Sequence, residues 1–141
     1  MKNKKYHFEY SDIESCFEKL GLKKNDSVFL STNVGMLGYP KSKNKNQILT
    51  SSKWILKALR KIIGKEGNIF VPTYSYSFTK RNKKFDPIKT KADIGYFPNF
   101  FLKQKHVIRS FDPMMSIAGI GPESKDILLK ISNNSFGKNC A

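Results

Sequence analysis

A strand–helix–strand pattern in the first half of the sequence constrains the fold most. Residues 27–30 (SVFL) form a short, nearly all-apolar run, which is typical of a strand with both faces covered. Apolar residues then recur at helical spacing over about 47–63, until Gly64, and a second apolar run follows at 69–71. A strand, a long helix and a strand form a βαβ crossover. This pattern predicts two parallel neighbouring strands in an α/β fold.

Shorter elements are predicted on both sides of this unit. Residues 11–20 are expected to form a helix, with Ser11 and Glu14 as its capping box. The other predicted elements are helices at 98–103 and 122–131 and a strand at 115–119. We therefore predict one α/β domain over residues 1–141, with a mostly parallel sheet flanked by helices. Three strands are few for such a sheet, so either a strand escapes detection or the fold is incomplete.

The charge of the chain limits its partners. The 141 residues include 26 Lys and Arg against 11 Asp and Glu, a formal net charge of +15, which attracts polyanions. Only three of these cations are arginines, whereas sequence-specific nucleic-acid readers depend on arginine forks. We therefore expect no specific nucleic-acid partner. The sequence has no apolar run of about 18 residues and no signal-peptide core, which predicts a cytoplasmic protein without a membrane partner.

Polar residues beside the predicted strands are the candidate ligand contacts. Ser31, Thr32 and Asn33 directly follow the first strand, where α/β proteins place ligands, although these residue types suit plain turns equally well. Arg109 precedes the third strand with Ser110 beside it, and a guanidinium there can fork onto a phosphate or a carboxylate. The alternative for Arg109 is a structural ion pair with nearby Asp112.

Several short motifs along the chain occur in a familiar order. They are the segments 21–30, 31–33 with Gly38, 64–73 (GKEGNIFVPT), 85–87 (FDP), Gly95 with Pro98, 109–116 (RSFDPMMS) and 135–137 (SFG). In this order and spacing the chain resembles the aminoglycoside 3-N-acetyltransferase family of acetyl-CoA-dependent antibiotic N-acetyltransferases. Two positions depart from the family pattern, because Ser31 and Asp112 stand where the family usually has histidines.

The resemblance implies an acetyl transfer from acetyl-CoA to an amino group of an aminoglycoside or amino sugar, without a metal. It implies CoA contacts for Ser31, Thr32, Asn33, Arg109 and Ser110. Asp86 would face the acceptor amine or merely cap the following turn. The positive charge would repel polycationic aminoglycosides, so it favours an amino sugar carried on a nucleotide diphosphate, as in surface-polysaccharide biosynthesis.

The resemblance covers only the N-terminal half of the family enzyme. The family's catalytic histidine and its carboxylate partner lie in a later segment, so no catalytic residue is expected within 1–141. The chain is then a fragment, a truncated form, half of a split gene or an inactive remnant, and the C-terminal half is a potential partner. In the fragment case, exposed apolar surface is expected at the edge of its sheet.

A second function class stays open beside the enzyme. Residues 74–85 interleave aromatic and basic side chains, a combination that single-strand nucleic-acid binders use. The aromatic members are Tyr74, Tyr76, Phe78 and Phe85, and the basic members are Lys80, Arg81, Lys83 and Lys84. The alternative is therefore a small basic module that binds RNA or another polyanion without catalysis.

Overall fold

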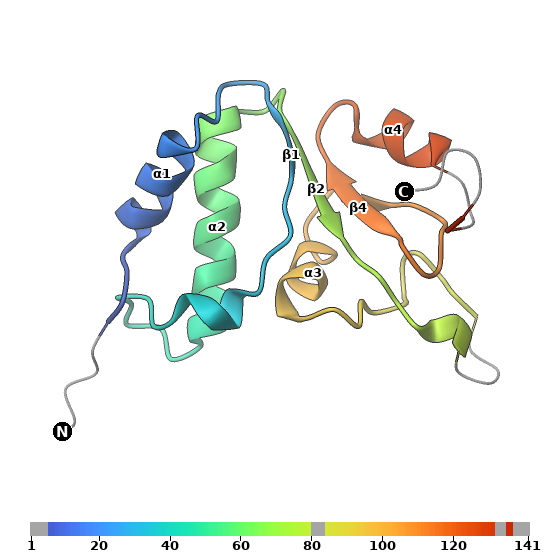
Figure 1. Cartoon of the computed structure of the whole chain (residues 1–141), viewed down its shortest axis with the longest axis horizontal. Coiled ribbons are helices and arrows are strands. Elements are labelled where there is room, and N and C mark those ends of the chain that lie inside the picture. Colours follow the sequence, from blue (N-terminus) through green and yellow to red (C-terminus); the bar gives the residue numbers. More distant parts are fainter. Residues whose placement is uncertain (1–5, 80–83, 132–134, 137–141) are drawn as a thin grey trace.

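A four-stranded sheet lies at the centre of the computed structural model, which describes residues 6–79, 84–131 and 135–136. The strands are β1 (Ser27–Phe29), β2 (Asn68–Pro72), β3 (Ile108–Arg109) and β4 (Ile117–Ile120). Their order across the sheet is β1-β2-β4-β3, of which β1, β2 and β4 are labelled in Figure 1. β1 and β2 are parallel, and β4 is antiparallel to both of its neighbours.

The helices lie on both sides of this sheet. They are α1 (Tyr10–Lys19), α2 (Gln47–Ile63), α3 (Tyr96–Phe101) and α4 (Ser124–Lys130), with short 3₁₀ turns η1 (Val34–Leu37) and η2 (Ser77–Thr79). The predicted βαβ unit is confirmed, because α2 joins the parallel pair β1 and β2. Asn46 begins α2 by accepting the Leu49 N–H at 2.9 Å.

The prediction of a mostly parallel sheet is wrong, since two of the three strand pairings are antiparallel. The two-residue strand β3 is not among the strands that the sequence predicts. Residues 110–116 connect it to β4, and a connection this short cannot carry the chain back for a parallel pairing. The capping box of α1 also differs from the prediction. Glu9 is the N-cap residue, and its N–H donates to the Asp12 carboxylate at 2.7 Å.

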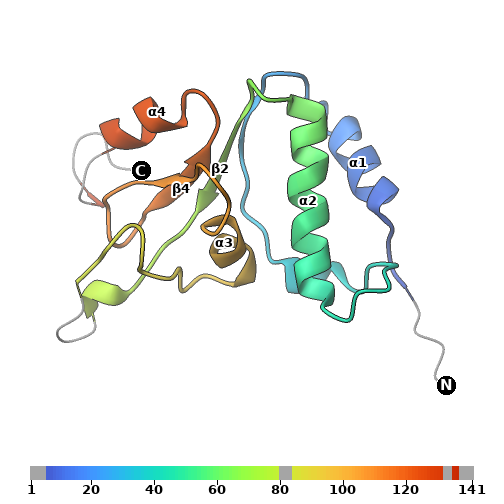
Figure 2. The same ribbon diagram turned by 180° about the vertical axis from the view of Figure 1, so that it is seen from behind.

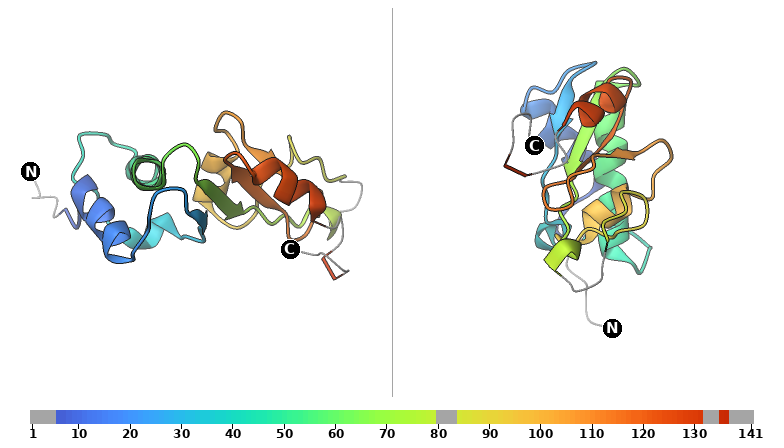
Figure 3. Two further views of the ribbon diagram at one scale, coloured as in Figure 1. Left: turned by 90° about the horizontal axis from the view of Figure 1, so that it is seen from above. Right: turned by 90° about the vertical axis from the view of Figure 1, so that its right-hand side faces the viewer.

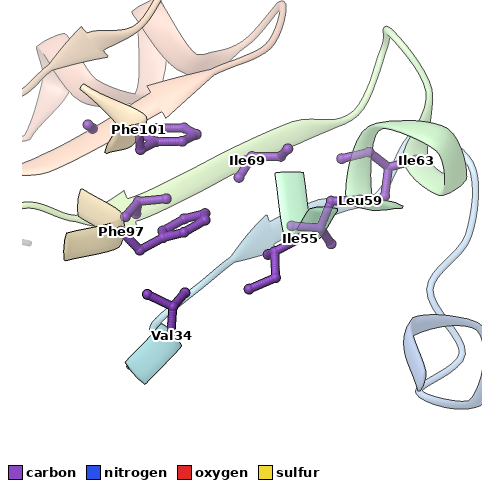
Figure 4. Close-up of a cluster of buried hydrophobic side chains, with 9 residues drawn as sticks. Val34, Ile55, Leu59, Ile63, Ile69, Phe97 and Phe101 are labelled. Atoms are coloured by element: carbon purple, nitrogen blue, oxygen red, sulfur yellow. The ribbon is translucent and has the colours of Figure 1, made fainter. Parts of the chain in front are cut away.

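The hydrophobic core lies between the sheet and the helices α2 and α3. Ile55, Leu59 and Ile63 project from α2 toward Ile69 of β2, and Phe97 of α3 closes the same cluster (Figure 4). The opposite face of the sheet is covered by α4, seen beside β4 in Figures 1 and 2. Figure 3 shows α1 against the outer side of α2, away from α4.

β1 is an edge strand with one exposed face, and this exposed face corrects the expectation that both faces are covered. Phe29 is 56% exposed, and Ser27 is also exposed. Among the described strands only β2 pairs with β1, so the outer edge of β1 faces no strand of the described chain. An apolar strand composition shows that a face is buried somewhere, but it does not show the position of the strand within a sheet.

Candidate functional site

Polar residues gather at the end of the sheet where the strands β1 and β2 terminate, which we call the site edge. Because β4 is antiparallel to both β2 and β3, the strands β2 and β3 run in the same direction and end at the same edge. Thr73, which follows β2, donates its N–H to the Ser116 carbonyl at 2.8 Å. The site therefore has the position at which open α/β sheets bind ligands.

Arg109 is the centre of a buried hydrogen-bond network at this edge. The residue is 5% exposed, and its guanidinium donates to the carbonyls of Thr73 and Thr90 and, at 3.0 Å, to Ser116 Oγ. The Phe85 ring lies against the guanidinium, 4.8 Å from its carbon. Burial lowers the pKa of Arg109 to about 10, and the charge of Asp93 partly offsets this effect.

The structure thus gives Arg109 backbone partners rather than the expected alternative, an ion pair with Asp112. Asp112 is fully buried, and its Oδ1 accepts the N–H groups of Met114 and Met115 at 2.7 and 2.9 Å. Ser135 donates its hydroxyl to the same oxygen at 2.9 Å. Asp112 therefore shapes the turn between β3 and β4.

Further buried hydroxyls extend the network. Ser110 accepts the Ile117 N–H at 3.0 Å, and Ser116 donates to the Thr73 carbonyl at 2.9 Å. Ser75 donates to the Pro113 carbonyl at 2.9 Å and contacts the Ser77 hydroxyl. These hydroxyls satisfy backbone groups that would otherwise be costly to bury, so they fix the shape of the edge.

Ser31 and Thr32 line a different feature, an apolar groove of about 320 Å³ between α1, α2 and the end of β1. The groove is lined by Phe8, Asp12, Ile13, Cys16, Phe17, Leu30, Ser31, Thr32, Leu37 and Ile55. Ser31 is exposed and Thr32 is half-buried. Asn33 begins η1 by accepting the Gly35 N–H at 3.2 Å.

The two sets of expected CoA contacts do not share one cavity. Arg109 lines a separate cavity of about 490 Å³, with Pro87, Ile88, Leu102, Val107, Ile108, Phe111 and Leu129. Ser31 and Thr32 line the groove and not this cavity, although both sets lie at the site edge, where β1, β2 and β3 end. The sheet topology therefore places them on one side of the molecule without bringing them together.

Asp86 caps a turn, which was one of its two expected roles. Its Oδ1 accepts the N–H groups of Ile88 and Lys89 at 2.8 and 3.1 Å. These two hydrogen bonds lower the pKa of the Asp86 carboxyl below its usual value. A carboxylate stabilised in this way is a stable anion and a poor proton donor at neutral pH.

The basic–aromatic segment is only partly described. Lys80, Arg81 and Lys83 lie outside the described residues. Tyr76 is 46% exposed, whereas the Phe85 ring is occupied by Arg109. Phe85 is therefore engaged within the chain rather than free for stacking on a base.

The described residues contain neither a metal-ligand cluster nor a membrane span. Over 6–79, 84–131 and 135–136, no three His, Cys, Asp or Glu side chains come together as a potential metal site. In the same part of the chain no helix has both the length and the hydrophobicity to cross a membrane.

Sequence reasoning missed Thr73, Ser75 and Ser116 as members of the network. The available signal was position, since Thr73 directly follows β2 and Ser116 directly precedes β4. The convergence of Thr73 and Ser116 on Arg109 depends on pairing between distant segments, which a single sequence does not reveal.

A protein-family model described as aminoglycoside 3-N-acetyltransferase matches residues 42–140. The chain belongs to this family. The match covers most of the sequence, including β2, β3 and β4 and the network around Arg109. No curated protein sequence matches the chain.

Solved structures, aminoglycoside acetyltransferases among them, share the fold. Aminoglycoside acetyltransferase AAC(3)-Xa is 20% identical with a TM-score of 0.71, and the match covers 87% of this chain and 47% of that one. AAC-IIIb in a binary complex with CoASH is 18% identical, with a TM-score of 0.73 and coverages of 91% and 51%. The YokD protein of Bacillus subtilis is 18% identical, with a TM-score of 0.76 and coverages of 93% and 57%. The chain spans about half the length of these structures.

Proposed function

We propose that this chain provides the CoA-binding half of an N-acetyltransferase, which transfers an acetyl group from acetyl-CoA to an amino group. The groove at the end of β1 carries the proposal. It offers the Ser31 and Thr32 hydroxyls beside an apolar wall, a combination that suits the pantetheine arm, with its amide groups and methyl groups. The family membership and the CoASH complex of a structural neighbour support the same assignment.

In this proposal the chain binds and orients acetyl-CoA, and it does not abstract the proton of the acceptor amine. The side chains that line the groove include no histidine among the described residues. Acetyl transfer forms a bond between the amine nitrogen and the acetyl carbon, breaks the thioester C–S bond so that CoA leaves as a thiolate, and moves a proton from the amine through a base to that thiolate. We assign the base to the portion of the enzyme that corresponds to the other half of the solved relatives.

The remaining expected site residues support this cleft. In this proposal Arg109 and Ser110 act from outside the groove, at the same end of the strands, and shape the phosphate and thioester region indirectly, because Arg109 fixes the backbone at Thr73 and Thr90. Asn33 continues the CoA contact beyond Ser31 and Thr32. Asp86 faces the acceptor side in this arrangement, while it caps its own turn.

The acceptor is an aminoglycoside or an amino sugar. Neighbours of the AAC(3)-IVa type were solved in complex with apramycin and with a gentamicin. The net charge of +15 favours instead an amino sugar carried on a nucleotide diphosphate, because long-range repulsion disfavours polycations. An acceptor with a diphosphate is therefore our preferred substrate class.

Calorimetric titration with CoA tests the groove assignment. Each lost hydrogen bond should weaken CoA binding by about threefold to tenfold in Ser31→Ala and Thr32→Val, the latter preserving side-chain volume. Lys43→Gln and Lys45→Gln serve as matched controls, because they remove charge from the exposed loop before α2. Equal weakening by the lysine variants, with no effect of the groove variants, would show charge attraction alone and overturn the assignment.

A further inference from the structure

The N-terminal arm, residues 6–9, lies along the loop at residues 38–41 and pairs with it. Phe8 and Pro40 form an isolated parallel bridge. The Lys41 N–H donates to the Phe8 carbonyl at 2.8 Å. A segment that precedes α1 is thereby fastened to the loop that follows β1.

His7 provides the side-chain part of this fastening. Its own N–H donates to the Tyr39 carbonyl at 2.8 Å, and its Nδ1 accepts the Tyr39 N–H at 2.9 Å. The two rings stack with centroids 5.4 Å apart and planes 20° from parallel. Gly38 leaves room for the imidazole, because a Cβ at this position would overlap Nδ1 and lie 3.0 Å from Cγ.

The hydrogen bond to Nδ1 exists in only one charge state of His7. A neutral imidazole can accept at Nδ1, whereas a protonated imidazole carries hydrogens on both nitrogens and accepts at neither. On protonation the Nδ1–H would point at the Tyr39 N–H, so attraction becomes repulsion. We infer that the arm is a pH-sensitive strap, closed while His7 is neutral and released when His7 is protonated.

The other charged and titratable groups of the arm and the loop include no second imidazole. The described ones are Tyr6 and Glu9 on the arm and Tyr39 and Lys41 on the loop, with a Glu9–Lys41 ion pair at 2.5 Å. Carboxyl groups titrate near pH 4, and phenols and amines titrate near pH 10. Between about pH 5 and 8, imidazole is the group that ordinarily changes charge.

Release of the strap would change the groove at the end of β1. Phe8 lines that groove together with Leu37. The Phe8 ring also packs edge-on against Trp54 of α2, with centroids 6.1 Å apart. When the arm leaves the loop, Phe8 loses its anchor, so one wall of the groove opens. The strap is thus a lid whose position depends on pH, whatever ligand the groove takes.

The single tryptophan of the chain makes this testable without any ligand, and therefore independently of the proposed function. Acidification from about pH 8 to pH 5 should shift Trp54 emission to longer wavelength in one transition, because Trp54 loses its contact with Phe8. The Lys41 amide should lose about fivefold to tenfold of its protection against hydrogen exchange over the same range, corrected for the intrinsic effect of pH.

Two variants, with a matched control, test whether the His7 imidazole causes the acid transition. In His7→Asn the amide oxygen takes the place of Nδ1 as an acceptor and does not titrate, so the acid transition should disappear with the strap closed. Gly38→Ala should hold the strap open at every pH, because the new Cβ displaces the imidazole. Its control is Gly21→Ala, since Gly21 also has a positive φ (+80°) but nothing lies within 4 Å of the Cβ that alanine would add.

Three results would overturn the inference. The first is an unchanged acid transition in His7→Asn, which would place the titrating group elsewhere. The second is equal behaviour of Gly38→Ala and Gly21→Ala, which would reduce the effect to backbone strain. The third is a pH-dependent Tyr39 amide signal beside an unaltered Lys41 amide and Trp54 emission, which would show that the imidazole titrates while the strap stays closed.

Discussion

Replacement of Arg109 tests whether its buried guanidinium stabilises the edge of the sheet. In Arg109→Met, at a position that is 5% exposed, the Thr90 carbonyl loses its charged donor, and the Thr73 carbonyl and the Ser116 hydroxyl keep only their hydrogen bond to each other. A buried polar group left without a partner costs about 1–3 kcal/mol. The substitution also removes the cost of burying the Arg109 charge, which offsets part of this loss. We therefore expect the free energy of unfolding to fall by about 3 kcal/mol.

Arg109→Lys separates charge from geometry. Lysine retains the positive charge, but its ammonium cannot reproduce the planar fork that reaches two carbonyls on different segments. We expect a loss of about 2 kcal/mol, intermediate between the native protein and Arg109→Met.

Urea unfolding followed by Trp54 fluorescence and circular dichroism measures both variants, with the midpoint compared at an unchanged m-value. Lys53→Met is the control, because it removes a positive charge from an exposed position of α2 and should change stability by less than about 0.5 kcal/mol. If Arg109→Met unfolds at the same urea concentration as Lys53→Met, the network does not stabilise the sheet and our reasoning is refuted.

Three further outcomes are expected. Leu59→Ala, at a fully buried position of α2, should cost about 2–5 kcal/mol in urea unfolding, whereas Leu20→Ala at a 71% exposed position should cost far less; similar losses would contradict the core assignment. Gly119→Ala should cost about 1–3 kcal/mol, because the new Cβ would lie 2.8 Å from the Phe70 ring, and a thermal midpoint equal to the native one would refute this packing. The pKa of Asp86 is lowered by folding, so its stabilising effect is present above the unfolded carboxyl pKa near 3.9 and is lost as the pH falls below it. Asp86→Asn should therefore lose less stability on acidification from about pH 6 to pH 2, and an identical pH profile would contradict the capping role.

The βαβ unit was predictable from the sequence because its signal is local and periodic. The 17 residues of α2 repeat their apolar side chains at helical spacing between two short apolar runs. The turn at Asp86 was likewise predictable as one of two roles, since an aspartate before proline caps a turn through its immediate neighbours.

Features that depend on distant segments were not predictable. β3 has two residues and no periodicity, so it becomes a strand only through its pairing with β4. The apolar run at residues 27–30 is typical of a buried strand, yet β1 lies at the edge of the sheet and Phe29 is exposed. Arg109 was recognised as unusual, but its partners at Thr73 and Thr90 lie 36 and 19 residues away along the chain.

The proposal that the end of β1 holds CoA is tested most directly by amide chemical-shift mapping of the protein titrated with CoA. We expect the largest saturable shifts at Ser31, Thr32 and Asn33 and at residues lining the groove, such as Leu30. These shifts should persist when salt is raised to about 200 mM, although weakened, because the apolar wall contributes to binding. Shifts confined to residues 41–45, and abolished by that salt, would contradict the proposal and leave only nonspecific attraction of an anion to lysines.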